Sequence, residues 1–364
     1  MEWPLVTVIT VNYNSLRFIS IVSESIKSIL GLDYSPLEVI IVDNGSTDGS
    51  FEFIKTIARR LSPSNVKVRF LKLSKNYGFA AANNIAFEKR DKRAKYVALI
   101  NNDLVPSMNS LRELINFLES NDEVAGVQGK ILDWNGSSID SAGCYITQYG
   151  NVYCIGQTLP SNSCNQSINV SFIENAYSVY RVEPVLKCGG LFLPFLFMYS
   201  EDYELGIRLW RNGYRLMYIP VIAGRHYRSA TSKKSTINLP LEYWIYRSEF
   251  TVITMYDELW LIHILLRIPM ILLRSLLEHN KSIMRGLIDG IYIGLRSRVN
   301  VKYFKFRSKT QPRIKMSIFR WYLLLIRLFM LYGTNVHRIL RVLMSRYLGC
   351  LSEHQQNNFI SQYM

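Results

Sequence analysis

Four short runs of β-branched and other apolar residues alternate with segments of helical spacing over the first 120 residues of this chain. The apolar runs cover residues 5–12, 39–42, 66–71 and 96–100. The segments in which apolar residues recur every three or four positions cover residues 15–30, 51–61, 79–88 and 109–119. Strands and helices that alternate at this spacing form right-handed βαβ units. The sequence therefore predicts an α/β fold with a mainly parallel sheet flanked by helices.

Polar residues follow two of these strands directly, at residues 43–46 (DNGS) and 101–103 (NND). In open α/β sheets, ligands bind at the carboxyl ends of the strands, so both segments are candidates for a binding site. Asp43 can accept hydrogen bonds from a nucleoside base or ribose, or it can cap the helix that follows. Asp103 can hold Mg²⁺ or Mn²⁺ bound to a diphosphate, because these cations take oxygen ligands. Its alternative role is that of a turn residue.

A third acidic segment, residues 201–204 (EDYE), lies where a helix predicted over residues 203–213 should begin. Adjacent carboxylates repel each other when both are ionised, so one can have a raised pKa and accept a proton near neutral pH. The alternative is that acidic residues at a helix N-terminus interact favourably with the helix dipole. His226 is a candidate metal ligand, with a purely structural role as its alternative.

Two nucleotide-binding motifs are missing from the sequence. The loop after the first strand, residues 12–15 (NYNS), has no glycine, and neither G-x-G-x-x-G nor a P-loop occurs there. This argues against a nicotinamide-dependent dehydrogenase. From residue 124 to about residue 185, shorter strands separated by Gly, Ser and Asn turns predict an antiparallel extension of the same sheet.

Positive charge is concentrated in the last third of the chain. The net charge is +15, and from residue 240 onward 18 Lys/Arg face 7 Asp/Glu, which leaves +11 there. These basic residues alternate with aliphatic and aromatic ones, a pattern typical of helices at an anionic membrane surface; nucleic acid binding and an ordinary core helix are the alternatives. We predict an α/β domain over residues 1–240 and a basic, apolar helical membrane-association region over residues 241–364.

Two apolar segments of this region, residues 259–277 and 318–332, raise the question of a membrane span. Arg267, Pro269 and Arg274 interrupt the first segment. A charge in the middle of a bilayer is costly, so the sequence favours a helix in the membrane plane over a spanning one. The five cysteines include no C-x-x-C pair, and we expect them to be reduced thiols without a zinc site.

Five blocks in a fixed order carry a resemblance to a known family. They are residues 6–14 (VTVITVNYN), 39–50 (VIIVDNGSTDGS), 76–86 (NYGFAAANNIA), 96–106 (YVALINNDLVP) and 198–220 (MYSEDYELGIRLWRNGYRLMYIP), followed by 226–231 (HYRSAT). Each block alone is a weak signal, but their combined order is specific. Through these blocks the chain resembles the inverting glycosyltransferases of family 2, with the GT-A fold. Within that family it looks most similar to the rhamnosyltransferase-like branch.

The resemblance implies a role for each matching residue. Asp202 would be the general base that deprotonates the acceptor hydroxyl, with Glu201 and Glu204 supporting the site. Asp103 and His226 would hold a divalent cation, Mg²⁺ or Mn²⁺. The residues implied to contact the nucleoside diphosphate sugar are Asn12, Asp43, Asn76, Asn83 and Asn102.

The implied reaction is transfer of a single sugar, with inversion, from a nucleoside diphosphate sugar to a glycan or a polyprenyl-lipid-linked acceptor. The Q-x-x-R-W signature of processive synthases is absent, and the short apolar segment after Gly189-Gly190 departs from the family pattern and favours a lipid-linked acceptor. We expect the enzyme at the cytoplasmic face of the cell membrane, with no nucleic acid partner. The alternative is a catalytically inactive, membrane-associated scaffold of the same fold.

Overall fold

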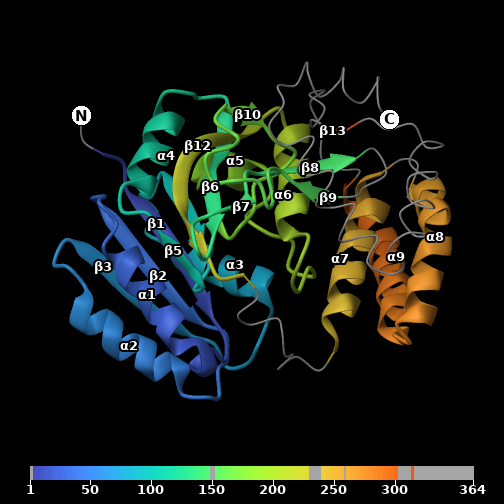
Figure 1. Ribbon diagram of the computed structural model, residues 1–364, viewed down its shortest axis with the longest axis horizontal. Coiled ribbons are helices and arrows are strands. Elements are labelled where there is room, and N and C mark those ends of the chain that lie inside the picture. Colours follow the sequence, from blue (N-terminus) through green and yellow to red (C-terminus); the bar gives the residue numbers. More distant parts are fainter. Residues whose placement is uncertain (1–2, 148–151, 229–238, 258–259, 302–312, 315–364) are drawn as a thin grey trace.

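The computed structural model describes residues 3–147, 152–228, 239–257, 260–301 and 313–314 (Figure 1). Within that part of the chain the predicted alternation of strands and helices is confirmed. The strands are β1 (Val6–Asn12), β2 (Leu37–Asp43), β3 (Val66–Lys72) and β4 (Tyr96–Ile100). The helices are α1 (Ile19–Leu30), preceded by the 3-10 turn η1 (Leu16–Phe18), then α2 (Ser50–Leu61), α3 (Phe79–Lys89) and α4 (Ser110–Glu119). The predicted helical segment 318–332 lies outside the described residues.

The central sheet has helices on both faces. Its strand order is β10-β12-β6-β11-β4-β1-β2-β3, and the four strands from β4 to β3 are parallel. Alternate side chains of β2 point to opposite faces: Val39 and Ile41 join the core under α1, α2 and α4, whereas Ile40 and Val42 join the core under α3 and α6 (Glu201–Arg211). A strand covered on both faces needs a continuous apolar run, which explains the sequence of β2.

The second half of the sheet is mixed, as predicted for the segment after residue 124. Strand β11 (Tyr177–Arg181) is antiparallel to both β4 and β6 (Val124–Asp133). Short strands β5 (Leu104–Pro106), β7 (Ile139–Ser141) and β10 (Ile168–Asn169) pair antiparallel at its margin, and α5 (Val182–Lys187) follows β11. A separate sheet contains β8 (Cys144–Thr147), β9 (Val152–Cys154) and β13 (Arg313–Ile314).

Strand β12 (Arg215–His226) was not predicted from the sequence. It pairs parallel with β6, and its register shifts at three places. Pro220 and Gly224 interrupt the apolar pattern by which strands are identified. A Cβ atom at Gly224 would lie 2.4 Å from the backbone oxygen of Val105, so the glycine is what allows β5 to approach β12. This strand carries His226 to the edge of the sheet where β4 ends.

Three helices follow the sheet: α7 (Leu241–Tyr256), α8 (Trp260–Leu277) and α9 (Lys281–Val301). Figure 1 shows them to the right of the sheet. They share a buried cluster of their own that includes Phe250, Ile264 and Ile283. Gly286 and Gly290 of α9 face the backbone of α7, where a Cβ atom would lie 2.5 Å from a carbonyl oxygen. Small residues at this spacing let two helices approach closely. The predicted boundary at residue 240 stays a prediction.

The cysteines differ from expectation at one position. Cys144, Cys154 and Cys188 are free thiols. Cys164 is disulfide-bonded. The expectation of five reduced thiols is therefore wrong for Cys164.

Candidate active site

A cavity of about 290 Å³ opens where β1 and β4 end and α6 begins. Its walls come from segments that are far apart in the sequence. The lining residues are Val11, Tyr13, Asn44, Asn76, Gly78, Phe79, Asn101, Asn102, Asp103, Glu174, Asn175, Ala176, Phe197, Met198, Tyr199, Glu201, Asp202, His226 and Arg228. The cavity thus lies at the carboxyl edge of the parallel strands, where an α/β sheet usually binds its ligand.

One side of the cavity holds a row of alternating acidic and basic side chains. His226 Nε2 lies 3.1 Å from Asp103 Oδ1, and His226 Nδ1 lies 3.0 Å from Asp140 Oδ2. Arg228 donates to Asp140 at 2.6 Å and to Glu174 at 2.9 Å. Burial alone would lower the pKa of His226, but the hydrogen bonds to the two aspartates outweigh burial and raise that pKa to about 9. His226 is therefore largely protonated at neutral pH, and its two ring nitrogens donate to Asp103 and Asp140.

The other side of the cavity holds two carboxylates at the start of α6. Burial, followed by the negative charge of Asp202, raises the pKa of Glu201 to about 8. Burial, followed by the charge of Glu174, raises the pKa of Asp202 to about 7. One oxygen of Glu201 is buried without a hydrogen-bond partner among the described residues. Glu201 and Asp202 are therefore poised to hold and exchange protons near neutral pH.

The start of α6 has an unusual backbone. Tyr199 and Ser200, directly before the helix, both adopt left-handed conformations, with φ of 66° and 62°. Non-glycine residues rarely adopt this conformation, and they retain it where surrounding structure enforces it, often at functional sites. Here Ser248 of α7 donates to the carbonyl of Met198 at 2.8 Å, and Glu204 donates its backbone N–H to Ser200 at 2.9 Å. These contacts fix the turn that presents Asp202 to the cavity.

Asparagines shape the remaining wall. Asn44 donates to Asn76 Oδ1 at 2.9 Å, and Asn76 Oδ1 also accepts from the backbone N–H of Gly78 at 2.8 Å. Gly78 has a φ of 87°, and a Cβ atom there would lie 2.3 Å from the carbonyl oxygen of Phe197. This glycine is therefore required for the loop that carries Asn76 to close over the cavity.

Three of the residues implied to contact the donor lie behind the wall instead of in it. Asn12 is buried and accepts from Asn102 Nδ2 at 3.1 Å, while its own amide donates to Ser50 at 3.1 Å. Asp43 is also fully buried and accepts from the backbone N–H of Ser46. Asn83 donates to the carbonyl of Phe79 within α3. Of the implied donor contacts, Asn76 and Asn102 line the cavity.

Glu204 points away from the cavity. Its carboxylate accepts from Arg208 at 2.6 Å and from the hydroxyl of Tyr256 at 2.5 Å. Arg208 in turn donates to the carbonyls of Cys188, Gly190 and Leu191. Glu204 thus anchors the buried arginine that holds the Gly189-Gly190 loop to α6.

The sequence did not single out Asp140, Glu174 or Arg228. Asp140 and Glu174 come from short, irregular segments, where no run of apolar residues marks a strand end. Arg228 was quoted only as part of the block that begins at His226. Its position two residues after a candidate ligand was the available signal.

The side chains at Asp103 and His226 fit a divalent cation. Both residues line the cavity, and their facing atoms are a carboxylate oxygen and an imidazole nitrogen. A cation bound here would displace the proton of Nε2, while Nδ1 would keep its hydrogen bond to Asp140, as in protein metal sites where a carboxylate orients a histidine. Oxygen ligands suit Mg²⁺ and Mn²⁺, and an imidazole ligand favours the transition metal of the two.

The family described as Glycosyl transferase family 2 matches residues 7–175, and the family described as Glycosyl transferase family group 2 matches residues 96–339, more than half of the chain. An uncharacterized glycosyltransferase of Nostoc sp. is 30% identical over 166 residues, which are 42% of this chain and 48% of that protein. The putative teichuronic acid biosynthesis glycosyltransferase TuaG of Bacillus subtilis is 31% identical over 115 residues, 32% of this chain and 42% of that protein.

The matches therefore span about half the length of these relatives. Among solved structures, GalNAc-T7 with UDP, GalNAc and Mn²⁺ superposes with a TM-score of 0.56 at 13% identity, over 71% of this chain and 50% of that one. At that identity the likeness concerns the fold, which is the GT-A fold expected from the sequence. The rhamnosyltransferase-like branch stays a prediction. On the family matches, the chain belongs to the family 2 glycosyltransferases.

Proposed function

We propose that this glycosyltransferase moves a single sugar, with inversion, from a nucleoside diphosphate sugar to a hydroxyl of a glycan or lipid-linked acceptor. The observation that carries the proposal is one cavity with two chemically different sides. Asp103 and His226 offer ligands for a cation on one side, and Asp202 offers a carboxylate with a pKa of about 7 on the other. Transfer to a hydroxyl needs both, a site for the leaving diphosphate and a base for the acceptor proton.

Asp202 is proposed as the general base. An ionised Asp202 accepts the proton of the acceptor hydroxyl as that oxygen attacks the anomeric carbon. A pKa near the working pH balances the ionised fraction against basicity, which is what a general base requires. Glu201, whose pKa is raised to about 8, stays largely protonated beside it and limits the charge in the buried pair.

Asp103 and His226 are proposed as the protein ligands of Mg²⁺ or Mn²⁺. When bound, such a cation neutralises charge on the departing diphosphate. Asp140 orients His226 through Nδ1, and Arg228 holds Asp140 in turn. Asn44, Asn76 and Asn102 are proposed to position the donor from the opposite wall, while Asn12 and Asp43 support the loops that carry them. TuaG, by its name a teichuronic acid enzyme, supports a glycan-building role.

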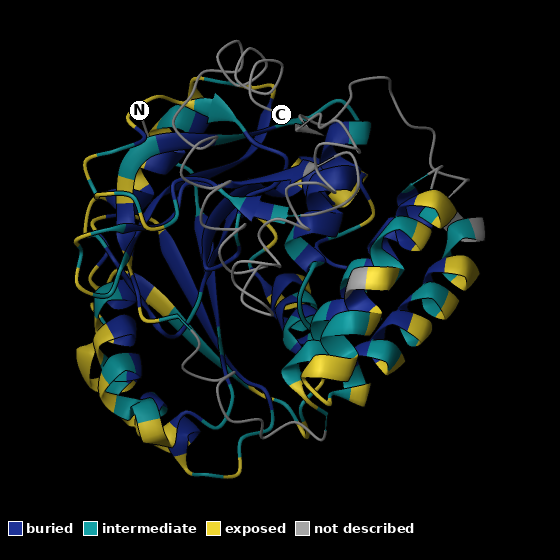
Figure 2. Cartoon of the chain, turned by 45° about the vertical axis from the view of Figure 1, so that its right-hand side comes forward, coloured by how far each residue is buried: buried dark blue, intermediate teal, exposed yellow. Residues whose placement is uncertain are grey.

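We further propose that α7–α9 hold the enzyme on an anionic membrane surface, at its cytoplasmic face. Helix α8 turns its polar groups inward: Arg267 donates to Glu249 of α7 at 2.7 Å, and Arg274 donates to the hydroxyl of Tyr246 at 3.1 Å. Six of its apolar side chains point outward and are 41–69% exposed, whereas Ile264 and Ile271 pack inside the helical cluster. The exposed six are Leu261, Ile262, Leu265, Leu272, Leu276 and Leu277. Figure 2 shows this exposed outer side on the helices at the right.

A helix with paired charges inside and leucines outside suits a lipid surface better than water. Among the described residues, α8 is the one helix whose length and composition would allow it to cross a membrane. The proposal of in-plane binding is tested by flotation with vesicles that contain phosphatidylglycerol. Leu265→Asn with Leu272→Asn should reduce binding at high salt, whereas Ile222→Asn, which changes a 51% exposed residue of the sheet domain, should not. Equal flotation of all three proteins would contradict the proposal.

The first test of the transfer proposal is isothermal titration of the purified chain with UDP, GDP and dTDP, with and without Mn²⁺. We expect one nucleotide to bind in the micromolar range and only with the metal, within the range typical of enzyme substrates. A folded sample that binds none of the three would contradict the proposal and favour the inactive scaffold. A protein that binds a nucleotide but neither transfers nor hydrolyses the sugar of any supplied donor would favour the same alternative.

A further inference from the structure

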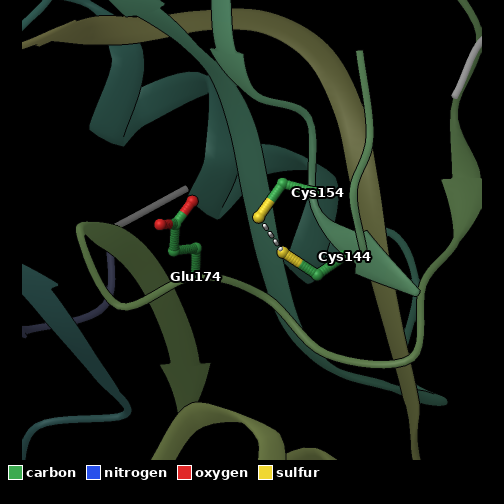
Figure 3. A group of neighbouring side chains, drawn as sticks. All are labelled: Cys144, Cys154 and Glu174. Carbon is green, nitrogen blue, oxygen red and sulfur yellow. Dashed lines mark hydrogen bonds between the residues drawn. The ribbon is translucent and has the colours of Figure 1, made fainter. Parts of the chain in front are cut away.

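Two cysteines face each other close to the active-site cavity. Cys144 on β8 and Cys154 on β9 are direct cross-strand partners in an antiparallel pair. Their sulfur atoms are 3.0 Å apart (Figure 3). Cys144 is buried and Cys154 is partly exposed. A disulfide requires about 2.05 Å between the sulfurs, so a shift of about 1 Å would close the bond.

The backbone around the pair favours that closure. Cys144 donates its N–H to the carbonyl of Phe172 at 3.1 Å and accepts from the N–H of Ser171 at 2.9 Å. Both backbone groups of Cys144 therefore point away from β9, and the pair with Cys154 is of the non-hydrogen-bonded type. In such pairs the Cα atoms lie about 4.5 Å apart, within the range that disulfides span.

The pair also borders the charged row of the active site. A carboxylate oxygen of Glu174 lies within 4.8 Å of both sulfurs (Figure 3). The same carboxylate accepts from Arg228, which lines the cavity. Arg228 also interacts electrostatically with Cys154. Cys154 is thus the accessible sulfur beside the charged row, and Cys144 is the buried sulfur placed to react with it.

We propose that Cys144 and Cys154 form a redox-active dithiol, a modification site that hydrogen peroxide converts into a cross-strand disulfide. The Cys154 thiolate attacks one peroxide oxygen, which gives a sulfenic acid and, after protonation of the hydroxide released, one water. The Cys144 sulfur then attacks the sulfenic sulfur, its proton leaves with the hydroxyl group, and a second water forms. Two thiols and one peroxide become one disulfide and two waters, and a thiol reductant reverses the oxidation.

The test is disulfide mapping of the full chain. It needs no transfer activity, so its failure can be distinguished from a failure of the proposed function. The folded protein is treated with hydrogen peroxide, free thiols are alkylated after denaturation, and unreduced peptides are analysed by mass spectrometry. We expect a peptide pair joined through Cys144 and Cys154, and its loss after treatment with dithiothreitol. Cys188, buried elsewhere in the fold, serves as an internal control and should remain alkylated.

Variants separate this site from its alternatives. Cys154→Ser, at the partly exposed position, should fold and should leave Cys144 without a disulfide partner; Cys144→Ser is the reciprocal variant. The proposal is overturned if both thiols of the folded wild-type protein stay alkylatable at peroxide levels that oxidise free cysteine. It is also overturned if the purified protein carries about one equivalent of Zn²⁺ that both variants lose, because the cluster would then be a metal site.

Discussion

The two sides of the cavity shift the pKa values of their carboxyl groups in opposite directions. On the β12 side, Asp140 accepts hydrogen bonds from His226 and Arg228, which outweigh the effect of burial and lower its pKa. On the α6 side, Glu201 has a buried oxygen without a hydrogen-bond partner among the described residues, and its pKa is raised to about 8. A carboxyl group thus holds a fixed charge on one side and an exchangeable proton on the other.

The opposite pKa shifts help to assign a chemical role to each carboxyl group of the site. Titratable groups whose surroundings push their pKa values apart are the usual acid–base partners and charge stabilisers of an enzyme. By that criterion the paired side is suited to a cation and a diphosphate, and the unpaired side to the acceptor proton.

Asp202→Asn should have the largest effect, because it removes the proposed base from the α6 side of the cavity. An amide cannot accept the acceptor proton, so we expect the transfer rate to fall by about 10³-fold or more, within the range of general-base effects. Titration with the preferred nucleotide and Mn²⁺ should give nearly unchanged affinity, because the donor side is untouched. Asp33→Asn, at an exposed residue that pairs with Arg112 away from the cavity, is the matched control. Retained turnover in Asp202→Asn would remove the base assignment.

Glu204→Gln tests whether an acidic residue of the same helix can be structural. Removal of its charge leaves Arg208 buried without an ionised partner, which typically destabilises a protein by about 3–5 kcal/mol. Urea denaturation should show this loss, while transfer per folded molecule at low temperature changes far less than in Asp202→Asn. If Glu204→Gln kept the stability of the wild type but lost transfer activity, Glu204 would be assigned to catalysis.

Asp140→Asn tests the paired side. The asparagine still occupies the site but no longer gives His226 a charged partner at Nδ1. Outer-sphere partners of this kind typically contribute 10–100-fold in metal affinity, so we expect Mn²⁺ affinity, followed by electron paramagnetic resonance of the free ion, to fall by about that factor. Glu183→Gln on α5, where the glutamate pairs with exposed Lys187, should leave it unchanged. Unaltered Mn²⁺ binding in Asp140→Asn would mean that His226 needs no such orientation.

The smallest expected effect is a shift in pH dependence. Because Asp202 must be ionised to act as base, the transfer rate should rise with pH and level off above about pH 7. The charge of Glu174 contributes to the raised pKa of Asp202, so Glu174→Gln should move the midpoint to lower pH. A pH–rate profile of both proteins at saturating Mn²⁺ measures this. A midpoint near pH 4 in the wild type would contradict the raised pKa.

The parallel half of the fold could be predicted almost residue by residue. Strand β4 was expected at residues 96–100 and has those bounds, because a continuous apolar run between turn residues has few other interpretations. Strand β12 was missed, because Pro220 and Gly224 break its pattern and its register depends on β5 and β6. Local sequence fixes elements whose burial is uniform, whereas irregular strands depend on partners that the sequence does not identify.

The site shows the same division. Asp103, Asp202 and His226 were expected from their positions beside predicted elements, and the structure brings all three to one cavity. Glu174 lines the cavity and Asp140 contacts His226 behind its wall. Both come from short strands or loops, so nothing local distinguished them from ordinary surface acids. Glu204 had a readable signal, because Arg208 follows at the i+4 position where helix ion pairs form.

The hydrogen bonds of Arg208 also determine which segment of the chain must be moved as a whole in a chimera with a relative. Its guanidinium ties the carbonyls of residues 188, 190 and 191 to the helix that carries Asp202, and α7 holds residue 198 between them. Residues 188–208 are thus held together as one structural unit by these hydrogen bonds. A chimera that replaced only the apolar segment 191–198 would place new cavity-lining side chains on contacts that the remaining residues do not match. To exchange this part of the cavity wall, an engineer should move residues 188–208 together with the α7 face that supports them.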